Sequence, residues 1–331
     1  MGPITGDAAF VGKEQLGFAR YAIRTLAAGR IRLVPGDTQL EPARAATVGA
    51  GFHGDTDLLA VVGPATNREV LAVARIFRRA PRLAFVSASA LNSSLTNGSI
   101  PSFFRVVPND NAQAPTTARY IRATLKAKDV VIVDDQTAYS KTLASRVQST
   151  LRTGGVRVIR RSVNQKVTDF ATLVSTIGDE IDVVYLPWQI AANGQLFGQQ
   201  LREQGKKAVV FGADALDSSD FKVAGSYVAA FAPDIRGVKG NSAFIKGYGA
   251  TFVSNFGPPA YVATQAAIVA IQKACADGSA TRAEVQKRLR ATRIPKTVLG
   301  GKLEFTANGD VLDAKFFIFK VGAGGKKTLV G

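Results

Sequence analysis

Short apolar runs alternate with amphipathic stretches along most of the chain. The apolar run at residues 58–62 is followed by a polar loop, a helical pattern over about 69–79, and a second apolar run at 83–86. Continuous apolar runs of this length are typical of strands that are buried on both faces, as in a parallel sheet. The pattern therefore predicts an α/β fold. The polar loops that follow the two runs lie at the sheet edge where open α/β folds bind ligands.

The same alternation of apolar runs and helical patterns continues before and after residues 58–86. Strands that alternate with helices indicate parallel sheets, and 331 residues are enough for about two domains of this kind. We expect helices over residues 13–28, 42–52, 112–125, 140–153, 169–177, 191–204, 241–252, 259–276 and 281–291. We expect strands over residues 31–34, 103–107, 130–133, 156–159, 183–186, 208–211, 229–233, 303–305 and 315–321.

Motifs in a fixed order resemble the periplasmic solute-binding proteins of the leucine/isoleucine/valine class, which serve ABC importers. The resemblance covers nearly the whole chain, and it depends on the order and spacing of the motifs together. The motifs are VVGP at 61–64, VSASALNSSLT at 86–96, FFRVVPND at 103–110, VVIVDDQTAYSKTLA at 130–144, TDFATLV at 168–174, IDVVYLP at 181–187 and VVFGADALDSSDF at 209–221.

This resemblance implies the type I periplasmic binding protein fold. Two Rossmann or flavodoxin-like lobes with parallel sheets would be joined by a hinge that the chain crosses more than once. The N-terminal lobe would comprise residues 1–108 and 236–302, and the C-terminal lobe 109–235 and 303–331. The family usually has a strand before the loop that corresponds to GPITG at residues 2–6. We expect this first strand of lobe 1, which is central in a flavodoxin-like sheet, to be missing here.

The resemblance also implies ligand contacts on loops that follow strands. Ser89 and nearby backbone N–H groups would hold a ligand carboxylate. Asp214 aligns with the acidic residue that pairs a ligand ammonium through a charge-assisted hydrogen bond. Trp188 would form an apolar wall. The full set of candidate ligand-binding residues is Asn67, Ser89, Ala90, Leu91, Tyr139, Trp188, Gln189, Asp214, Tyr261, Phe10 and Val11.

Each candidate also has a purely structural interpretation. Asn67 could cap the following helix, Asp214 could cap a helix that starts near Ser218, and Trp188 could pack between the lobes. Leu91 stands where the amino-acid binders usually have Thr, so an amide or an aromatic carboxylate is an alternative ligand to an α-amino acid.

Composition excludes other classes of protein. The single Cys275 rules out an internal disulfide, and the single His53 rules out a histidine-based metal cluster. The chain has no nucleophile elbow, phosphate-binding loop or dinucleotide fingerprint, so we expect no catalytic residues, no cofactor and no metal. The net charge of +17 is spread along the chain without interleaved aromatic residues, which favours a solvated basic surface over nucleic-acid binding.

The sequence as a whole predicts a non-enzymatic receptor. The resemblance implies that two lobes close by hinge motion on a small amino acid, branched-chain or similar, and that the closed form is recognised by the membrane permease of an ABC importer. We expect a monomer that is exported and either periplasmic or attached to the cell surface. No signal peptide pattern is present, and a mature exported chain would have lost one. A ligand-sensing regulator of the same fold is the alternative function.

Overall fold

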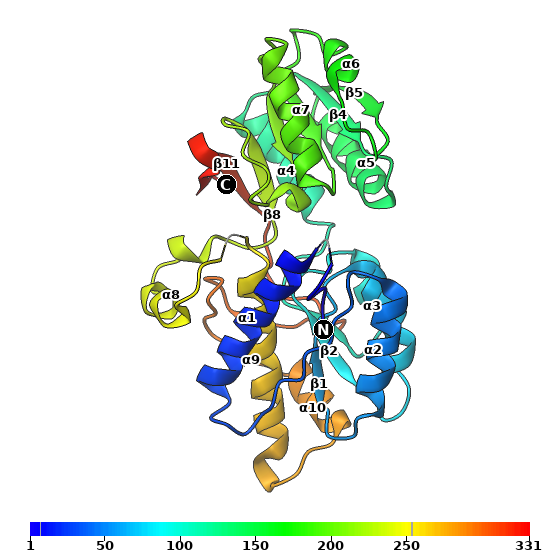
Figure 1. Cartoon of the computed structure of the whole chain (residues 1–331), viewed down its shortest axis with the longest axis vertical. Helices are drawn as coiled ribbons and strands as arrows, with labels where there is room; N and C mark the ends of the chain where they lie inside the picture. The colour runs from blue at the N-terminus through cyan, green and yellow to red at the C-terminus, as the bar shows by residue number, and fades with distance from the viewer. Residues whose placement is uncertain (7, 253) are drawn as a thin grey trace. The chain divides into compact units, whose positions relative to one another are not determined.

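The chain folds into two compact units, each with its own hydrophobic core (Figure 1). The computed structural model describes residues 1–6, 8–252 and 254–331. Unit 1 comprises Met1–Asn109 and Ala232–Lys315, and unit 2 comprises Asp110–Phe231 and Phe316–Gly331. The chain therefore passes from one unit to the other after Asn109, Phe231 and Lys315.

Unit 1 is built on a three-stranded parallel sheet in the order β1 (Ala60–Val62), β2 (Ala84–Ser87), β3 (Phe103–Arg105). Every residue of β2 and β3 is buried, which explains why these strands read as continuous apolar runs. The helices of unit 1 are α1 (Ala9–Leu26), α2 (Pro42–Gly54), α3 (Asn67–Phe77), α8 (Ser242–Tyr248), α9 (Gly257–Ala274) and α10 (Arg282–Arg290).

These helices cover both faces of the sheet in unit 1. Figure 1 shows α1 and α9 on one face and α2 and α3 on the other. The core between α2, α3 and the sheet includes Val70, Phe77 and Phe85. Smaller elements complete the unit: the antiparallel pair β9 (Arg293–Ile294) and β10 (Leu303–Glu304), and the short helices η1 (Ser93–Thr96), η4 (Ile235–Gly237) and η5 (Cys275–Asp277).

The strand expected over residues 31–34 does not form. Residues 31–36 form no ladder: Gly36 O accepts one hydrogen bond from Gly2 N, and a single parallel bridge joins Gly2 to Asp37. A strand requires a neighbour for its backbone N–H and C=O groups. No strand of the described chain lies between this segment and β1, so the apolar pattern alone does not produce a ladder.

Unit 2 contains a seven-stranded sheet in the order β12-β11-β8-β7-β6-β4-β5. Its central strands are parallel, whereas β11 pairs antiparallel with both β8 and β12. The strands are β4 (Asp129–Asp134), β5 (Arg157–Ser162), β6 (Val183–Leu186), β7 (Val209–Gly212), β8 (Tyr227–Ala230), β11 (Phe317–Val321) and β12 (Lys327–Leu329). Parallel sheets with helices in both units confirm the predicted α/β fold.

The helices of unit 2 pack in pairs, α4 with α5 and α6 with α7. The main helices are α4 (Gln113–Arg119), α5 (Ala138–Thr153), α6 (Ala171–Ser175) and α7 (Ala191–Glu203). The π-helical turn η2 (Tyr120–Thr124) continues α4, and the unit also contains the short helices η3 (Asp214–Leu216) and η6 (Ala323–Gly325). Apolar side chains of α6 and α7 meet β4, β6 and β7 in one core that contains Val131, Val184 and Val210.

The unit boundaries differ from the expected lobes at Asn109 and at residues 232–235 and 303–315. All three are expected in the C-terminal lobe and lie instead in unit 1. The contacts explain the difference for the longer stretch, because Asp310 forms an ion pair of 2.6 Å with buried Arg105 of β3. The Phe305 ring also lies 5.2 Å from that of Phe104. These interactions hold 303–315 against the first sheet.

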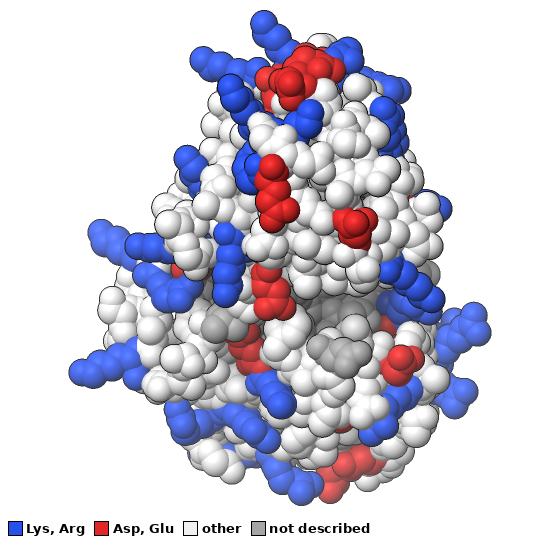
Figure 2. Space-filling view, turned by 45° about the horizontal axis from the view of Figure 1, so that its top comes forward, with Lys and Arg blue, Asp and Glu red and all other residues white. Residues whose placement is uncertain are grey.

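The basic residues are distributed over the surface. Figure 2 shows Lys and Arg side chains scattered over the visible face, with acidic side chains between them, and no single patch that collects the charge. This distribution agrees with a solvated basic surface. Among the described residues, no helix is both long enough and apolar enough to cross a bilayer.

Candidate functional site

A buried carboxylate lies at the carboxyl end of β7 in unit 2. Asp214 is only 6% exposed and begins the short helix η3. Its Oδ1 accepts a hydrogen bond of 2.5 Å from the Tyr139 hydroxyl and another from the side-chain amide of Gln113. Tyr139 lies in the first turn of α5 and Gln113 begins α4, so two helices aim donors at one oxygen. Within the described chain, no side chain donates to the other oxygen, Oδ2.

The environment of Asp214 favours a cationic partner. Burial raises the pKa of the Asp214 carboxyl, and the hydrogen bonds from Tyr139 and Gln113 oppose that rise. Burial and the nearby Asp214 charge raise the pKa of Tyr139 well above its usual value, so its hydroxyl stays a donor. A carboxylate in this position is costly to keep ionised, and an ammonium bound beside it would favour the charged form.

Two further buried polar atoms belong to residues that interact with Asp214. Gln113 Oε1 and Tyr185 Oη are buried, and neither has a partner with good hydrogen-bond geometry among the residues that the structure describes. Burial, followed by the Asp214 charge, raises the pKa of Tyr185 well above its usual value. Buried polar atoms are nearly always paired in proteins, so these atoms are candidates for contacts with a ligand.

Unit 1 brings a second set of polar groups to the carboxyl ends of β1 and β2. The Ser89 hydroxyl donates to Ala65 O at 2.7 Å and accepts from the side-chain amide of Gln15, on α1, at 2.9 Å. Asn67 is the first residue of α3, and its Oδ1 accepts from the backbone N–H of Asn92 at 3.0 Å. Asn67 thus ties two loops together, while Thr66 caps α3 through a capping box.

A buried arginine supports the loop that carries Ser89, Ala90 and Leu91. Arg105 of β3 donates to Ala90 O and Asn92 O, both at 2.9 Å, and to the Thr96 hydroxyl. Asp310 neutralises the guanidinium. Ala90 and Leu91 are themselves buried, so this loop can offer a ligand mainly its backbone and Ser89.

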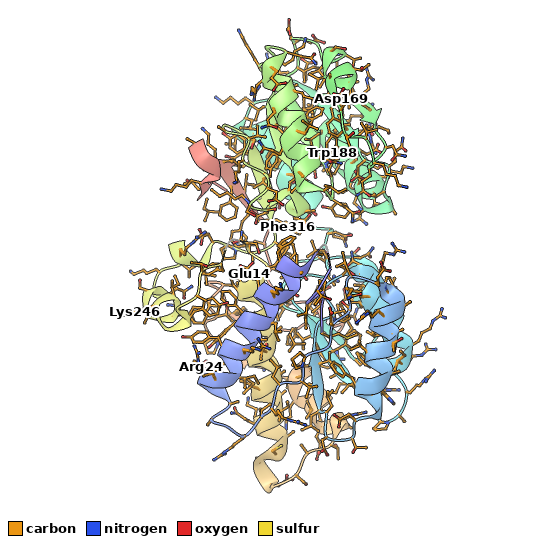
Figure 3. All side chains as sticks on the ribbon, in the orientation of Figure 1. Glu14, Arg24, Asp169, Trp188, Lys246 and Phe316 are labelled. Atoms are coloured by element: carbon orange, nitrogen blue, oxygen red, sulfur yellow. The ribbon has the colours of Figure 1, made fainter. Side chains whose placement is uncertain are left out.

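Two predicted contacts lie in hydrophobic cores. Trp188 is 1% exposed, packs against Phe170 and Phe197, and donates its indole N–H to Val133 O at 2.7 Å (Figure 3). Its expected role as an apolar wall for a ligand is therefore replaced by a role in packing unit 2. Tyr261 is also buried, with its ring 4.7 Å from that of Phe244.

The remaining candidates differ in their surroundings. Phe10 and Val11, expected in a loop, lie in the first turn of α1, and the Phe10 ring is 47% exposed. Gln189 is exposed just beyond β6, and its backbone N–H donates to Asp135 at 3.1 Å. The structure thus groups Asp214 with Tyr139 and leaves Gln189 outside that group.

A model of the family described as periplasmic binding protein matches residues 1–326. The chain belongs to this family.

Several relatives of this periplasmic binding protein are named as binding proteins for leucine or for branched-chain amino acids in general. It is 28% identical to the Leu/Ile/Val-binding protein BraC3 of Rhizobium johnstonii, over 97% of this chain and 90% of that protein. Its fold matches that of LivJ, the branched-chain amino acid transporter substrate-binding protein of Streptococcus pneumoniae, which was solved with isoleucine. The TM-score is 0.86 and the identity is 22%, over 99% of this chain and 97% of that chain. A leucine-binding protein of Thermotoga maritima matches with a TM-score of 0.85, 21% identity and coverage of 100% and 96%.

Sequence reasoning missed Gln15, Gln113 and Arg105 in this periplasmic binding protein. Each of these residues lies in a helix or strand, whereas the predicted ligand contacts were expected on loops that follow strands. The signal available for Arg105 was a charge inside the apolar strand at FFRVV, because a buried Arg requires an acidic partner. Groups of three or more His, Cys, Asp or Glu placed to hold a metal do not occur in the part of the chain that the structure describes.

Proposed function

We propose that this protein is the extracytoplasmic solute-binding component of an ABC importer and that it binds a branched-chain amino acid. The observation that carries the proposal is the buried Asp214 carboxylate. Tyr139 and Gln113 hold one of its oxygens, and the other has no side-chain donor among the described residues. An ammonium group would complete this arrangement with a charge-assisted hydrogen bond. The relatives' names support an aliphatic amino acid over an amide or an aromatic carboxylate.

Unit 1 carries polar groups of its own that suit a carboxylate. The N-terminus of α3 lies at the carboxyl end of β1, and helix N-termini bind anions. Ser89 and the loop that Arg105 supports lie at the carboxyl end of the neighbouring strand, β2. The exposed ring of Phe10 offers an apolar surface for an aliphatic side chain.

The partner would be the membrane permease of the importer, which would recognise the ligand-bound form. We propose that the protein is exported and acts as a monomer. The family to which it belongs is one of binding proteins, and we propose no catalytic activity for it.

Ligand identity is tested by mass spectrometry of small molecules that co-purify with the protein. Isothermal titration of the ligand-free protein with leucine, isoleucine, valine and benzoate then ranks the candidates. We expect the three amino acids to bind and benzoate not to bind. Binding of benzoate alone would replace the amino-acid proposal with an aromatic carboxylate.

Tyr139→Phe is expected to weaken leucine binding by about tenfold. The substitution removes a donor to Asp214, and a hydrogen bond to a charged group is worth about 1.5–3 kcal/mol. Titration calorimetry at pH 7 measures the change. Tyr120→Phe is the matched control, because the Tyr120 ring packs on Phe211 in the same unit and its hydroxyl does not contact Asp214. Equal losses for the two variants would remove Tyr139 from the site.

A further inference from the structure

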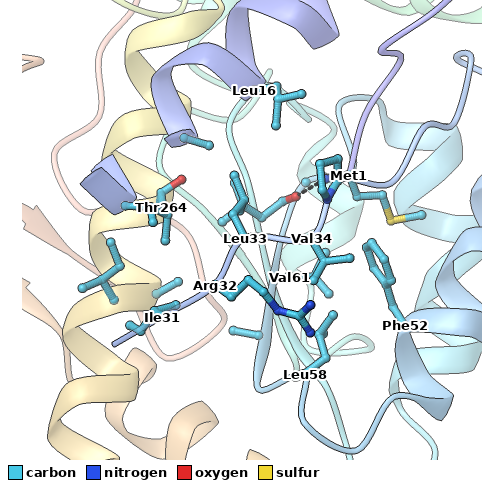
Figure 4. Close-up of a pocket in the computed structure, with 18 of the residues that line it drawn as sticks. Met1, Leu16, Ile31, Arg32, Leu33, Val34, Phe52, Leu58, Val61 and Thr264 are labelled. Carbon is cyan, nitrogen blue, oxygen red and sulfur yellow. Dashed lines mark hydrogen bonds between the residues drawn. The ribbon is translucent and has the colours of Figure 1, made fainter. Parts of the chain in front are cut away.

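An ion pair lies in the interior of unit 2, three residues beyond Asp214. The Lys327 ammonium, on β12, contacts Asp217 Oδ1 at 2.5 Å, and the two side chains are only 16% and 6% exposed. Buried charges are costly to remove from water, whereas the largely apolar lining of the cavity beside β1 in unit 1 has no such cost (Figure 4). The ion pair therefore requires an explanation beyond packing.

The ion pair closes the turn that carries Asp214. Asp217 directly follows η3, and its backbone N–H donates to Asp214 O at 2.9 Å. The Lys327 ammonium donates to Asp217 Oδ1 and also to Ser218 O, the second at 3.1 Å. Lys327 thus joins β12, at the edge of the sheet, to the end of this turn.

Packing holds the middle of the same turn. Leu216 is fully buried and lies against Gly194 of α7 and Gly212 of β7. A Cβ added at Gly194 would lie 2.7 Å from Leu216 Cδ2, and one at Gly212 would lie 2.9 Å from Leu216 Cβ, so both positions favour glycine. The turn is held at two points, by Leu216 and by Lys327, and the position of Asp214 depends on both.

Asp217 also acts on Asp214 through its charge. Burial is the main cause that raises the pKa of the Asp214 carboxyl, and the charge of Asp217 raises it further. Lys327 opposes this second effect, because a cation beside Asp217 compensates its negative charge. Tyr139 on α5 and Tyr185 on β6 also face Asp214, but burial raises the pKa of each well above its usual value, so both stay neutral.

We propose that Lys327 is a positioning residue for the carboxylate that binds the ligand ammonium. By pairing with Asp217, it holds the turn in place and leaves Asp214 as the carboxylate of this turn that recognises a cation. The inference rests on the proposed function, because it gives Lys327 a part in amino-acid recognition. Without Lys327, two buried carboxylates would share one turn, and a proton would neutralise one of them.

Lys327→Met tests the effect of charge. Two neighbouring buried carboxylates without a cation keep a proton up to a higher pH, and a ligand ammonium displaces that proton when it binds. The pH range over which leucine affinity rises with pH is therefore expected to move upward by about one pH unit. Titration calorimetry between about pH 5 and 8, in buffers of different ionisation enthalpy, measures the affinity and the protons released.

Two further variants separate the ion pair from net charge. Lys327→Arg keeps the cation and is expected to restore the pH profile of the parent protein. Lys326→Met is the matched control, because Lys326 is the exposed neighbour of Lys327 and its replacement changes net charge equally. We expect its profile to equal that of the parent. An unmoved profile for Lys327→Met, or an equal shift for Lys326→Met, would overturn the proposal.

The double variant Asp217→Asn/Lys327→Met tests the positioning of Asp214. It leaves no unpaired buried charge, so it is expected to be more stable than Lys327→Met and to remain measurable if that variant does not fold. Its pH range should match that of the parent. Leucine affinity at about pH 8 is expected to fall about tenfold, the effect of one lost hydrogen bond to a charged group. Unchanged affinity would show that the ion pair does not position Asp214.

Failure of the proposed function gives a different result. If the protein recognises no ammonium, leucine does not bind to the parent protein, and the effect of Lys327 is measured without a ligand. NMR of the aspartate carboxyl carbons then follows the titration of Asp214. A pKa of Asp214 that is higher in Lys327→Met than in the parent and in Lys326→Met would support the link between Lys327 and Asp214. Equal values in all three proteins would refute it.

Discussion

Asp214→Asn is expected to weaken leucine binding by about a hundredfold or more. Asp214 would pair the ligand ammonium in a site from which water is excluded, since its side chain is buried. Removing one partner of a buried charge pair typically costs about 3–5 kcal/mol because the other charge remains unpaired. At about 1.4 kcal/mol per tenfold change in Kd, this loss exceeds two orders of magnitude. Titration calorimetry with leucine measures it.

The same substitution should not destabilise the ligand-free protein. Asn keeps an oxygen that accepts from Tyr139 and Gln113, so the local hydrogen bonds persist. Burial raises the pKa of the Asp214 carboxyl, which means that the folded chain disfavours its ionised form at neutral pH. Replacing the carboxylate removes this cost, and the Tm is expected to stay equal or to rise. If Asp214→Asn loses leucine binding and keeps its Tm, Asp214 contributes to ligand binding and not to folding.

Asp220→Asn is the matched control for charge. Asp220 is exposed and follows Asp214 by six residues, so its replacement changes net charge equally without touching the buried carboxylate. We expect its leucine affinity to equal that of the parent protein. If benzoate binds and leucine does not, and Asp214→Asn leaves benzoate binding intact or improves it, Asp214 does not recognise an ammonium.

Arg105→Met is expected to lower the free energy of unfolding of unit 1 by about 3–5 kcal/mol, because it leaves the Asp310 carboxylate without its buried cation. Ala90 O and Asn92 O would lose their donors at the same time. The loop that carries Ser89 would then lose its support, so leucine affinity should also fall. Urea unfolding followed by circular dichroism measures the stability, since the single Trp188 reports on unit 2.

An exposed ion pair in the same unit is the control for Arg105. Arg293 pairs with Glu304 between β10 and β9, but its side chain is 74% exposed. Exposed pairs contribute about 0–1 kcal/mol, so Arg293→Met should change the urea midpoint little. Comparable losses for the two variants would show that the Arg105 network does not stabilise unit 1.

Much of the fold was predictable from apolar periodicity. The strands around residues 130–133 and 183–186 and the helix over 191–204 were located closely, because burial on both faces or on one stripe leaves a clear pattern. Segment 31–34 shows the limit of this reasoning. Its pattern is that of a strand, but pairing depends on a neighbour in space. The placement of residues 303–315 likewise depends on Asp310 meeting Arg105, which lies far away in the sequence.

The candidate site was predictable only in part. The search for loops after strands led to Asp214 and Ser89, which lie at sheet edges, and their ligand roles stay predictions. Trp188 was misjudged because position at a strand end does not determine side-chain direction, and its indole turns inward to Val133 O. Gln113 could not be found from loops at all, since it reaches Asp214 from the start of α4. Three-dimensional packing determines where a side chain points, and the pattern of residues along one sequence does not contain that information.

The course of the chain also determines when each unit can be completed during synthesis. The last residues of the chain supply β11, which pairs with β8 across the sheet of unit 2, while Asp310 neutralises Arg105 in unit 1. Neither unit can therefore reach its final form on the ribosome until almost the whole chain has emerged. Until then, β8 has an open edge and Arg105 is a buried charge without its partner. Pairings between distant parts of a chain also slow folding. The late-forming contacts of this chain therefore delay its compact state.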